Sequence, residues 1–239
     1  MKRIALVTGA SRGLGATLAR VLAARGMDLV LGARTRDDLA RIADELRATG
    51  VAVLTRHGDL ADPAVRDALV DAAASLGGLD LLCNNASVLG GLAPLSSVTP
   101  DNLERILRVN LVAPLDLVRK AVPLLSVRHG LAIAISSDAA EGAYAGWGAY
   151  GASKAALDLA TRTLAGELAS RHVGAVSVDP GDMRTRMHQE AFPGEDISDR
   201  PLPEVTRPFW EWLLDQDPIA ITGRRFRAQD SRDRWGAVA

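Results

Sequence analysis

The sequence predicts an α/β fold, a doubly wound parallel sheet of seven strands with helices on both faces. Short aliphatic runs alternate with longer amphipathic segments from one end of the chain to the other. The runs lack the polar alternation of a half-exposed strand, which indicates strands that are covered on both faces, as in a parallel sheet. Right-handed crossovers between such strands produce the doubly wound arrangement.

The elements alternate in order along the chain. Strands are expected at 3–7, 29–32, 51–56, 79–83, 131–136 and 174–179, with a last edge strand at 224–228. Helices, most of them with apolar residues at three- and four-residue spacing, are expected at 13–25, 36–49, 62–76, 101–127, 150–171 and 208–214. Only residues 182–208, with prolines and mixed charges, depart from this rhythm. We therefore expect one domain over 1–239 that carries a substrate-loop insertion near 183–207.

The composition excludes several classes of function. The chain has 239 residues and a formal net charge of -1, which leaves no electrostatic footprint for nucleic acid. No apolar run approaches the roughly 20 residues of a membrane span, and the start is too short and glycine-rich for a signal peptide. The single Cys83 fits a reducing compartment, and the four histidines have no metal-ligand spacing. We expect a cytoplasmic, soluble protein without a metal site.

A glycine-rich stretch, TGASRGLG at 8–15, joins the first strand to the first helix. Gly9, Gly13 and Gly15 permit a tight turn and a close approach of the backbone to a ligand. The N-terminus of the helix behind them offers unpaired N–H groups and a partial positive charge to a pyrophosphate. A plain glycine turn is the alternative. The position between strand and helix favours a dinucleotide site.

The second strand ends about twenty residues after the glycine loop, where an NAD-binding chain carries an acid for the ribose 2′-hydroxyl. Arg34 stands near that point, and no carboxylate appears before Asp37. An arginine there would bind a 2′-phosphate by charge-assisted hydrogen bonds, and Arg12 in the glycine loop could approach the same group. NADP(H) is therefore the preferred cofactor, with NAD(H) as the alternative.

These features resemble the short-chain dehydrogenase/reductase family, in the single-domain branch with the glycine pattern T-G-x-x-x-G-x-G. The stretches GDL at 58–60, NNAS at 84–87 and PGDMRT at 180–185 are similar to further motifs of that family. The resemblance covers nearly the whole chain and implies a Rossmann-like fold. It also implies a nicotinamide cofactor held by Gly9, Ser11, Arg12, Gly13, Leu14, Gly15, Arg34, Thr35, Asp59, Leu60, Asn84, Ala86, Tyr150, Lys154, Pro180, Gly181 and Thr185.

The resemblance implies a catalytic group of four residues: Asn110, Ser137, Tyr150 and Lys154. Tyr150 and Lys154 lie four apart, so they project from one face of a helix. Ser137 lies thirteen positions before Tyr150, which is the family's interval. Its neighbour Ser136 could be mistaken for it, but alternation along a strand points the two side chains to opposite faces.

Asn110 has a second interpretation. Pro114 and Pro123 disturb the hydrogen bonding of its helix, so an ordinary role at a helix kink is the alternative to catalysis. In the family role, Asn110 would anchor a water that links Lys154 to solvent.

The chemistry explains why these residue types are needed. Reducing a ketone requires a hydride from the nicotinamide and a proton for the developing alkoxide. Tyr150 would exchange the proton, although free tyrosine has a pKa of about 10. Lys154 would lower that pKa and hold the nicotinamide ribose, while Ser137 would position the carbonyl oxygen. We expect an NADP(H)-dependent oxidoreductase that interconverts a ketone or aldehyde and an alcohol.

Two other functions remain open at this stage: an NAD(H)-dependent sugar or polyol dehydrogenase, and a non-catalytic nucleotide-sensing regulator. The expected partners are a small carbonyl or alcohol substrate and a second copy of the chain. The tail, which lacks the family's Asp-Gly-Gly ending, favours a homodimer through the long helices 101–127 and 150–171 over a homotetramer.

Overall fold

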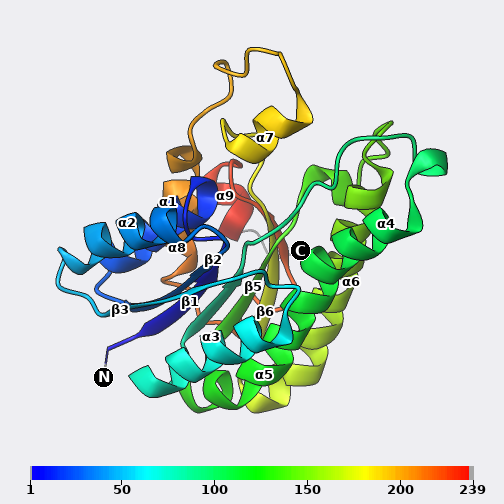
Figure 1. Ribbon diagram of the computed structural model, residues 1–239. Helices are drawn as coiled ribbons and strands as arrows, with labels where there is room; N and C mark the ends of the chain where they lie inside the picture. Colours follow the sequence, from blue (N-terminus) through cyan, green and yellow to red (C-terminus); the bar gives the residue numbers. More distant parts are fainter. Residues whose placement is uncertain (1, 237–239) are drawn as a thin grey trace.

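Parallel strands form one seven-stranded sheet in the computed structural model, which describes residues 2–236 (Figure 1). The strand order is β3-β2-β1-β4-β5-β6-β7, so the direction of winding reverses between β1 and β4. The predicted fold class is confirmed. The strands are β1 Ile4–Thr8, β2 Asp28–Ala33, β3 Val53–His57, β4 Leu81–Asn84, β5 Leu131–Ile135, β6 Gly174–Asp179 and β7 Arg225–Arg227.

Helices cover both faces because successive side chains of each strand point to opposite sides. On β1, Ala5 and Val7 belong to a core shared with α1, α2 and α8, whereas Ile4 and Leu6 belong to a core shared with α3, α5 and α6. The helices on the two faces are α1 Gly13–Ala24, α2 Arg36–Arg47 and α8 Arg207–Leu213, against α3 Pro63–Leu76, α5 Ala113–Arg128 and α6 Gly148–Leu168.

The helix predicted over 101–127 is wrong as a single element. The chain forms α4 Pro100–Leu107, a π-helical turn Arg108–Val112 and then α5. Pro114 has no N–H to donate to the carbonyl of Asn110, four residues earlier, so a regular α-helix cannot continue through this point. Asn110 lies in this wider turn between the two helices, and its side chain is fully buried.

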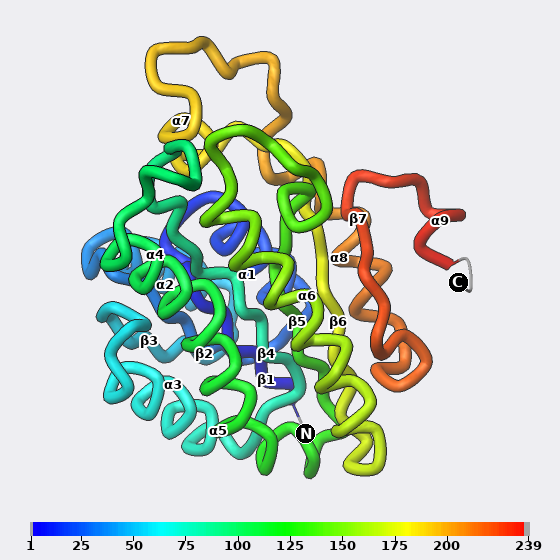
Figure 2. Tube along the Cα trace, turned by 90° about the vertical axis from the view of Figure 1, so that its right-hand side faces the viewer, coloured from blue at the N-terminus to red at the C-terminus, as the bar shows by residue number. Residues whose placement is uncertain are grey.

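The segment between β6 and α8 rises above the carboxyl ends of the strands (Figures 1 and 2). It contains α7 Arg186–Ala191 and a short 3-10 turn, Pro203–Thr206. The carboxyl ends of the strands and this segment lie at the same end of the molecule. The irregular stretch expected near 183–207 therefore stands over the sheet edge where parallel α/β folds bind ligands.

The C-terminal part returns to the sheet as β7 and the short helix α9 Arg232–Gly236 (Figure 2). Trp235 is buried against Phe209 and Trp212, with ring centroids 5.2 and 5.7 Å apart, and its Nε1 donates to the Arg227 carbonyl. No helix in residues 2–236 is both long and apolar enough to cross a membrane.

Candidate functional site

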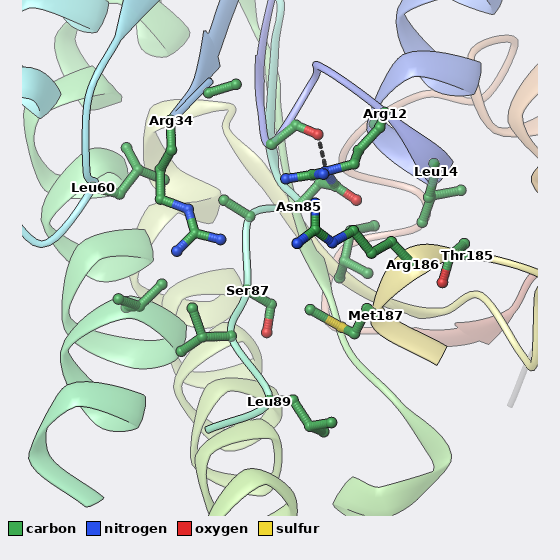
Figure 3. Close-up of a pocket in the computed structure, with 18 of the residues that line it drawn as sticks. Arg12, Leu14, Arg34, Leu60, Asn85, Ser87, Leu89, Thr185, Arg186 and Met187 are labelled. Atoms are coloured by element: carbon green, nitrogen blue, oxygen red, sulfur yellow. Dashed lines mark hydrogen bonds between the residues drawn. The ribbon is translucent and has the colours of Figure 1, made fainter. Parts of the chain in front are cut away.

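A cavity of about 450 Å³ opens above the carboxyl ends of the strands (Figure 3). The loops after β1, β2, β3, β4 and β6 supply its walls, together with α6 and α7. The predicted cofactor residues that line it are Gly9, Ser11, Arg12, Gly13, Leu14, Gly15, Arg34, Thr35, Asp59, Leu60, Ala86, Tyr150, Lys154, Pro180 and Thr185. The structure thus brings together residues from both halves of the sheet.

The glycine loop fits a bound phosphate because it has no room for side chains. Gly9 has φ +68°, and a Cβ there would lie 2.8 Å from Asn85 Nδ2. A Cβ on Gly15 would collide with the Gly9 carbonyl oxygen. The helix α1 begins at Gly13, and no side chain caps its N-terminal N–H groups. The first residues of this helix, Gly13, Leu14 and Gly15, line the cavity, where an anion would complete the hydrogen bonding of these groups.

Asn85 holds the glycine loop in place. Its Nδ2 donates to the carbonyl of Thr8 at 2.8 Å and to that of Gly9 at 3.3 Å. The Thr8 hydroxyl in turn accepts from the backbone N–H groups of Asn85 and Ala86, both at 3.0 Å. The loops after β1 and β4 are therefore one hydrogen-bonded unit beneath the cavity.

Four arginines line the cavity. Figure 3 shows Arg12, Arg34 and Arg186 extending into the same space from different loops. Arg105 of α4 completes the set and lies 3.8 Å from the carboxylate of Asp59. No local sequence pattern pointed to Arg105, because it sits on a separate helix, far along the chain from the glycine loop.

Two predicted cofactor residues lie outside the cavity lining. Asn84 is buried, and its Nδ2 donates to the Pro114 carbonyl at 3.4 Å. Gly181 forms a left-handed turn with φ +72°, closed by its N–H donating to the Asp179 carboxylate at 3.0 Å. In this structure both residues shape the loops around the cavity.

The neighbouring serines at the end of β5 have different partners. Ser136 is buried, and its hydroxyl donates to Asp158 at 2.8 Å. The Ser137 hydroxyl donates to Asp138 at 2.9 Å, accepts from the Ala139 N–H, and lies close enough to the Tyr150 phenol to lower its pKa. Ser137 is therefore the serine that meets the tyrosine, although Ser136 is the one that borders the cavity.

Tyr150 is buried on the first turns of α6, where desolvation disfavours the phenolate. This burial raises the pKa of Tyr150 to about 12, although the nearby Ser137 and Ser87 hydroxyls act in the opposite direction. The direction is opposite to the lowered pKa that the sequence led us to expect. In the protein without cofactor, Tyr150 is thus a proton donor in the resting state.

Lys154 lies one turn further along α6 and is 1% exposed. Its Nζ donates to the Ile135 carbonyl at 2.7 Å and lies 5.6 Å from the centre of the Tyr150 ring. Burial lowers the pKa of Lys154 to about 8, while the negative charge of Asp158 raises it. The lysine therefore carries its charge at neutral pH and loses it in mild alkali.

Asn110 uses its whole side chain to join three segments. Its Oδ1 accepts from the Ser87 hydroxyl and the Val88 N–H, at 3.0 and 2.9 Å. Its Nδ2 donates to the Val88 carbonyl and the Ser153 hydroxyl, at 2.9 and 3.0 Å. These four bonds fill the capacity of the amide. A water relay at Asn110 would need its main-chain carbonyl.

Apolar and aromatic groups flank Tyr150 on the side of α7. Trp147 packs edge-on against Tyr150 and also meets Phe192, with ring centroids 5.9 and 6.2 Å apart. His188 stacks on Phe192 at 4.9 Å, and its Nε2 is buried without a hydrogen-bond partner. The wall beside the phenol is therefore apolar, with one unsatisfied imidazole nitrogen behind it. No group of His, Cys, Asp and Glu residues in the described chain could hold a metal ion.

Comparison with known proteins places this site in a family. The chain matches the family described as short chain dehydrogenase over residues 3–196. The uncharacterized oxidoreductase YciK of Escherichia coli K12 is 31% identical over 239 residues, which is 96% of this chain and 93% of that protein. Glycine betaine reductase ATRR of Emericella nidulans is 36% identical over 220 residues, 91% of this chain but only 17% of that longer protein.

A solved structure supports the same assignment. A protein from Escherichia coli CFT073, complexed with NADPH, is 32% identical and superposes with a TM-score of 0.87 over 95% of this chain and 97% of its own. The match to the family covers most of the chain, including the glycine loop and the Tyr150–Lys154 pair. The chain therefore belongs to the short-chain dehydrogenase/reductase family of oxidoreductases.

Proposed function

We propose that this protein uses NADP(H) to interconvert a ketone or aldehyde and an alcohol, with Tyr150 as the proton donor and acceptor. One observation carries the proposal. The cavity that begins at the uncapped N-terminus of α1 ends at Tyr150 and Lys154, so a dinucleotide lying along it would bring its reactive end to the phenol.

The choice of NADP(H) rests on charge. Arg12 and Arg34 line the end of the cavity near β2, where no carboxylate of the second strand is present to bind a ribose hydroxyl. Guanidinium groups bind a 2′-phosphate by paired, charge-assisted hydrogen bonds. The relative solved with NADPH supports the same choice.

Each remaining residue has a part in the reaction. The bound nicotinamide supplies or accepts the hydride. Ser137 directs the substrate oxygen toward the phenol by a hydrogen bond, and Tyr150 gives that oxygen its proton. The positive charge of Lys154, 5.6 Å from the ring centre, then stabilises the tyrosinate that is left. Asn110 holds the loop that carries Ser87 beside the phenol.

The larger architecture is also part of the proposal. The continuous sheet from β1 to β7 supports a single domain over 1–239, and the buried, unpaired Cys83 fits the cytoplasm. Exposed Val112, next to α5, and Leu159 on α6 support a homodimer through the long helices. Light scattering on the purified protein measures that assembly.

Tyr150→Phe tests the function directly. The wild-type protein should reduce members of a panel of aldehydes and ketones with NADPH, followed by nicotinamide absorbance. The variant should lose about a thousandfold or more in kcat, because it lacks the proposed proton donor to the substrate oxygen, while its Kd for NADPH changes little. A variant that keeps substantial reductase activity would contradict the assignment of Tyr150. A wild-type protein active only with NAD(H) on polyols would favour the dehydrogenase alternative.

A further inference from the structure

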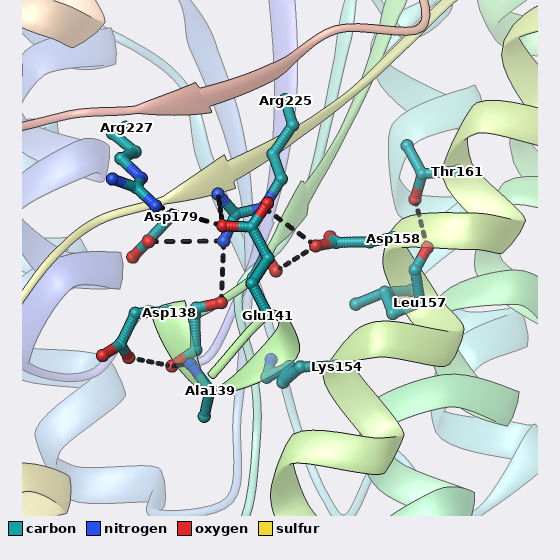
Figure 4. A network of polar contacts seen from close by, with 12 residues as sticks. Asp138, Ala139, Glu141, Lys154, Leu157, Asp158, Thr161, Asp179, Arg225 and Arg227 are labelled. Atoms are coloured by element: carbon teal, nitrogen blue, oxygen red, sulfur yellow. Dashed lines mark hydrogen bonds and ion pairs between the residues drawn. The ribbon is translucent and has the colours of Figure 1, made fainter. Parts of the chain in front are cut away.

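Arg225 sits on the edge strand β7, yet its side chain points back beneath the active site (Figure 4). Its Nη2 donates to the Ser137 carbonyl at 2.8 Å, and its Nε donates to Asp158 at 3.0 Å. The same guanidinium lies 3.3 Å from the carboxylate of Asp179 and 3.2 Å from that of Glu141. The side chain is 17% exposed, so these contacts lie mostly out of water.

Each of these partners adjoins a residue of the site. Ser137 is the serine whose hydroxyl lies beside the Tyr150 phenol and lowers its pKa. Asp158 stands one turn beyond Lys154 on the same face of α6. Asp179 ends β6 and holds the turn at Gly181. One planar guanidinium therefore connects the serine loop, the catalytic helix and the loop after β6.

The guanidinium also balances two partly buried carboxylates. Asp158 has one oxygen that accepts from Ser136 and Arg225, while its other oxygen is buried without a partner. Burial raises the pKa of Asp179, and the Gly181 N–H and the charge of Arg225 counter this. Without Arg225, these two negative charges would lie near the reacting groups with little compensation.

We propose that Arg225 is a positioning residue for the reductase reaction proposed above: it fixes Ser137 against Tyr150 and shields the reaction centre from Asp158 and Asp179. The proposal rests on the proposed function for its kinetic part. The proposed role has two parts. The geometric part is the hydrogen bond from Arg225 to the Ser137 carbonyl, and the electrostatic part is the neutralisation of the Asp158 and Asp179 carboxylates by the guanidinium.

The electrostatic part predicts the direction in which the pKa values of Lys154 and Tyr150 change when Arg225 is replaced. Asp158 is the charged group that acts on Lys154, and its negative charge favours the protonated amine. Asp179 and Asp138 act on Tyr150, where negative charge raises the pKa of the phenol. Removing the positive charge of Arg225 takes away the cation that pairs with Asp158 and Asp179. The pKa values of Lys154 and Tyr150 should therefore both rise.

The kinetic experiment compares Arg225→Met, Arg225→Lys and the control Arg227→Met in NADPH-dependent reduction. Arg227 lies two residues along β7, is exposed, and shares only the Glu141 contact of Arg225, so its loss should change kcat by less than about twofold. Arg225→Met should lower kcat by about tenfold to a hundredfold, as expected for a small misplacement of a catalytic group, with a smaller change in the Kd for NADPH. Arg225→Lys keeps the positive charge but loses the planar guanidinium with its several N–H donors, so it should recover only part of kcat.

A second experiment does not depend on activity. The chain has only three lysines (Lys2, Lys120 and Lys154), so NMR of lysine-labelled protein can resolve the titration of each side chain. Lys154 should titrate near 8 in the wild type, higher in Arg225→Met, lower in Asp158→Asn, and unchanged in Arg227→Met.

The outcomes separate the two proposals. A wild-type protein without reductase activity would overturn the proposed function, while the lysine titration would still test the shielding by Arg225. If Arg225→Met folds with unchanged kcat and an unchanged Lys154 titration, the positioning role is refuted. If Arg225→Met does not fold, Arg225→Lys and Asp158→Asn carry the test. Wild-type kcat in Arg225→Lys, or an unshifted Lys154 in Asp158→Asn, would then refute it.

Discussion

The half of the sheet formed by β1, β2 and β3 places the main chain of the glycine loop at the cavity, whereas the half formed by β5, β6 and β7 carries the buried side chains of Tyr150 and Lys154 beside it. In the first half, Gly9, Gly13 and the uncapped start of α1 line the cavity. In the second half, Tyr150 and Lys154 are almost fully buried, and Lys154 donates to the Ile135 carbonyl. We therefore expect the first half to be disturbed most by substitutions that add atoms to the loop, and the second half by substitutions that change the charge around the buried groups.

The largest effect on cofactor binding should come from filling the glycine loop. In Gly15→Ala the new Cβ meets the carbonyl oxygen of Gly9 and the amide of Asn85, so the loop must move away from the position that leaves its N–H groups free. We expect loss of NADPH binding by about a hundredfold or more, measured by nucleotide fluorescence, with a lower Tm.

Gly166→Ala is the matched control, because Gly166 also lies in a helix but has nothing within 4 Å of an added Cβ. Alanine at an exposed helical position stabilises by about 0.5–1 kcal/mol relative to glycine. This variant should therefore raise the Tm slightly and leave NADPH binding unchanged. If Gly15→Ala and Gly166→Ala bound NADPH equally well, the main chain of the glycine loop would not be the part of the first half that holds the cofactor.

A smaller effect is expected at the edge of the same half. Arg34→Asp replaces a donor for the 2′-phosphate by a group that repels it and can accept from a ribose hydroxyl. The ratio of kcat/KM for NADPH to that for NADH should fall by about tenfold to a hundredfold. Arg41→Asp removes an exposed arginine of α2 that does not line the cavity, and should leave the ratio unchanged. Unaltered selectivity in Arg34→Asp would argue against a 2′-phosphate site at this position.

The burial of Tyr150 in the second half can be tested by measuring the ionisation of its phenol, without an activity assay. Tyr144 and Tyr150 are the two tyrosines, so phenolate absorbance in Tyr144→Phe reports only Tyr150. At pH 10, where an ordinary tyrosine is about half ionised, the folded variant should show almost no phenolate, because burial raises the pKa of Tyr150 to about 12. The same variant unfolded in guanidinium should titrate normally. A folded variant that is half ionised at pH 10 would show that burial does not control this phenol.

The sign of these pKa shifts favours reduction at neutral pH. Tyr150 is protonated there and ready to donate, while Lys154 is still charged below about pH 8. Alcohol oxidation needs the deprotonated phenol, so its kcat/KM should rise with pH. The measured pH profiles of both directions link the burial of Tyr150 to the direction of catalysis.

Local patterns in the sequence predicted the fold and much of the site. The glycine loop depends on Gly9 and Gly13, only four residues apart, and the Tyr150–Lys154 pair depends on a single helical turn. The strands were recognisable because both faces are buried, so their apolar runs are continuous. Such features need only neighbours along the chain.

The tertiary structure alone decided how these parts act together. Asn110 meets Ser153 across 43 residues, and Arg225 meets the Ser137 carbonyl across 88. The direction of the Tyr150 pKa follows from burial, which depends on packing from several elements rather than on the neighbouring Lys154. Desolvation and long-range hydrogen bonds are properties of the packed molecule, so the charge balance of the active site could not be predicted from the order of its residues.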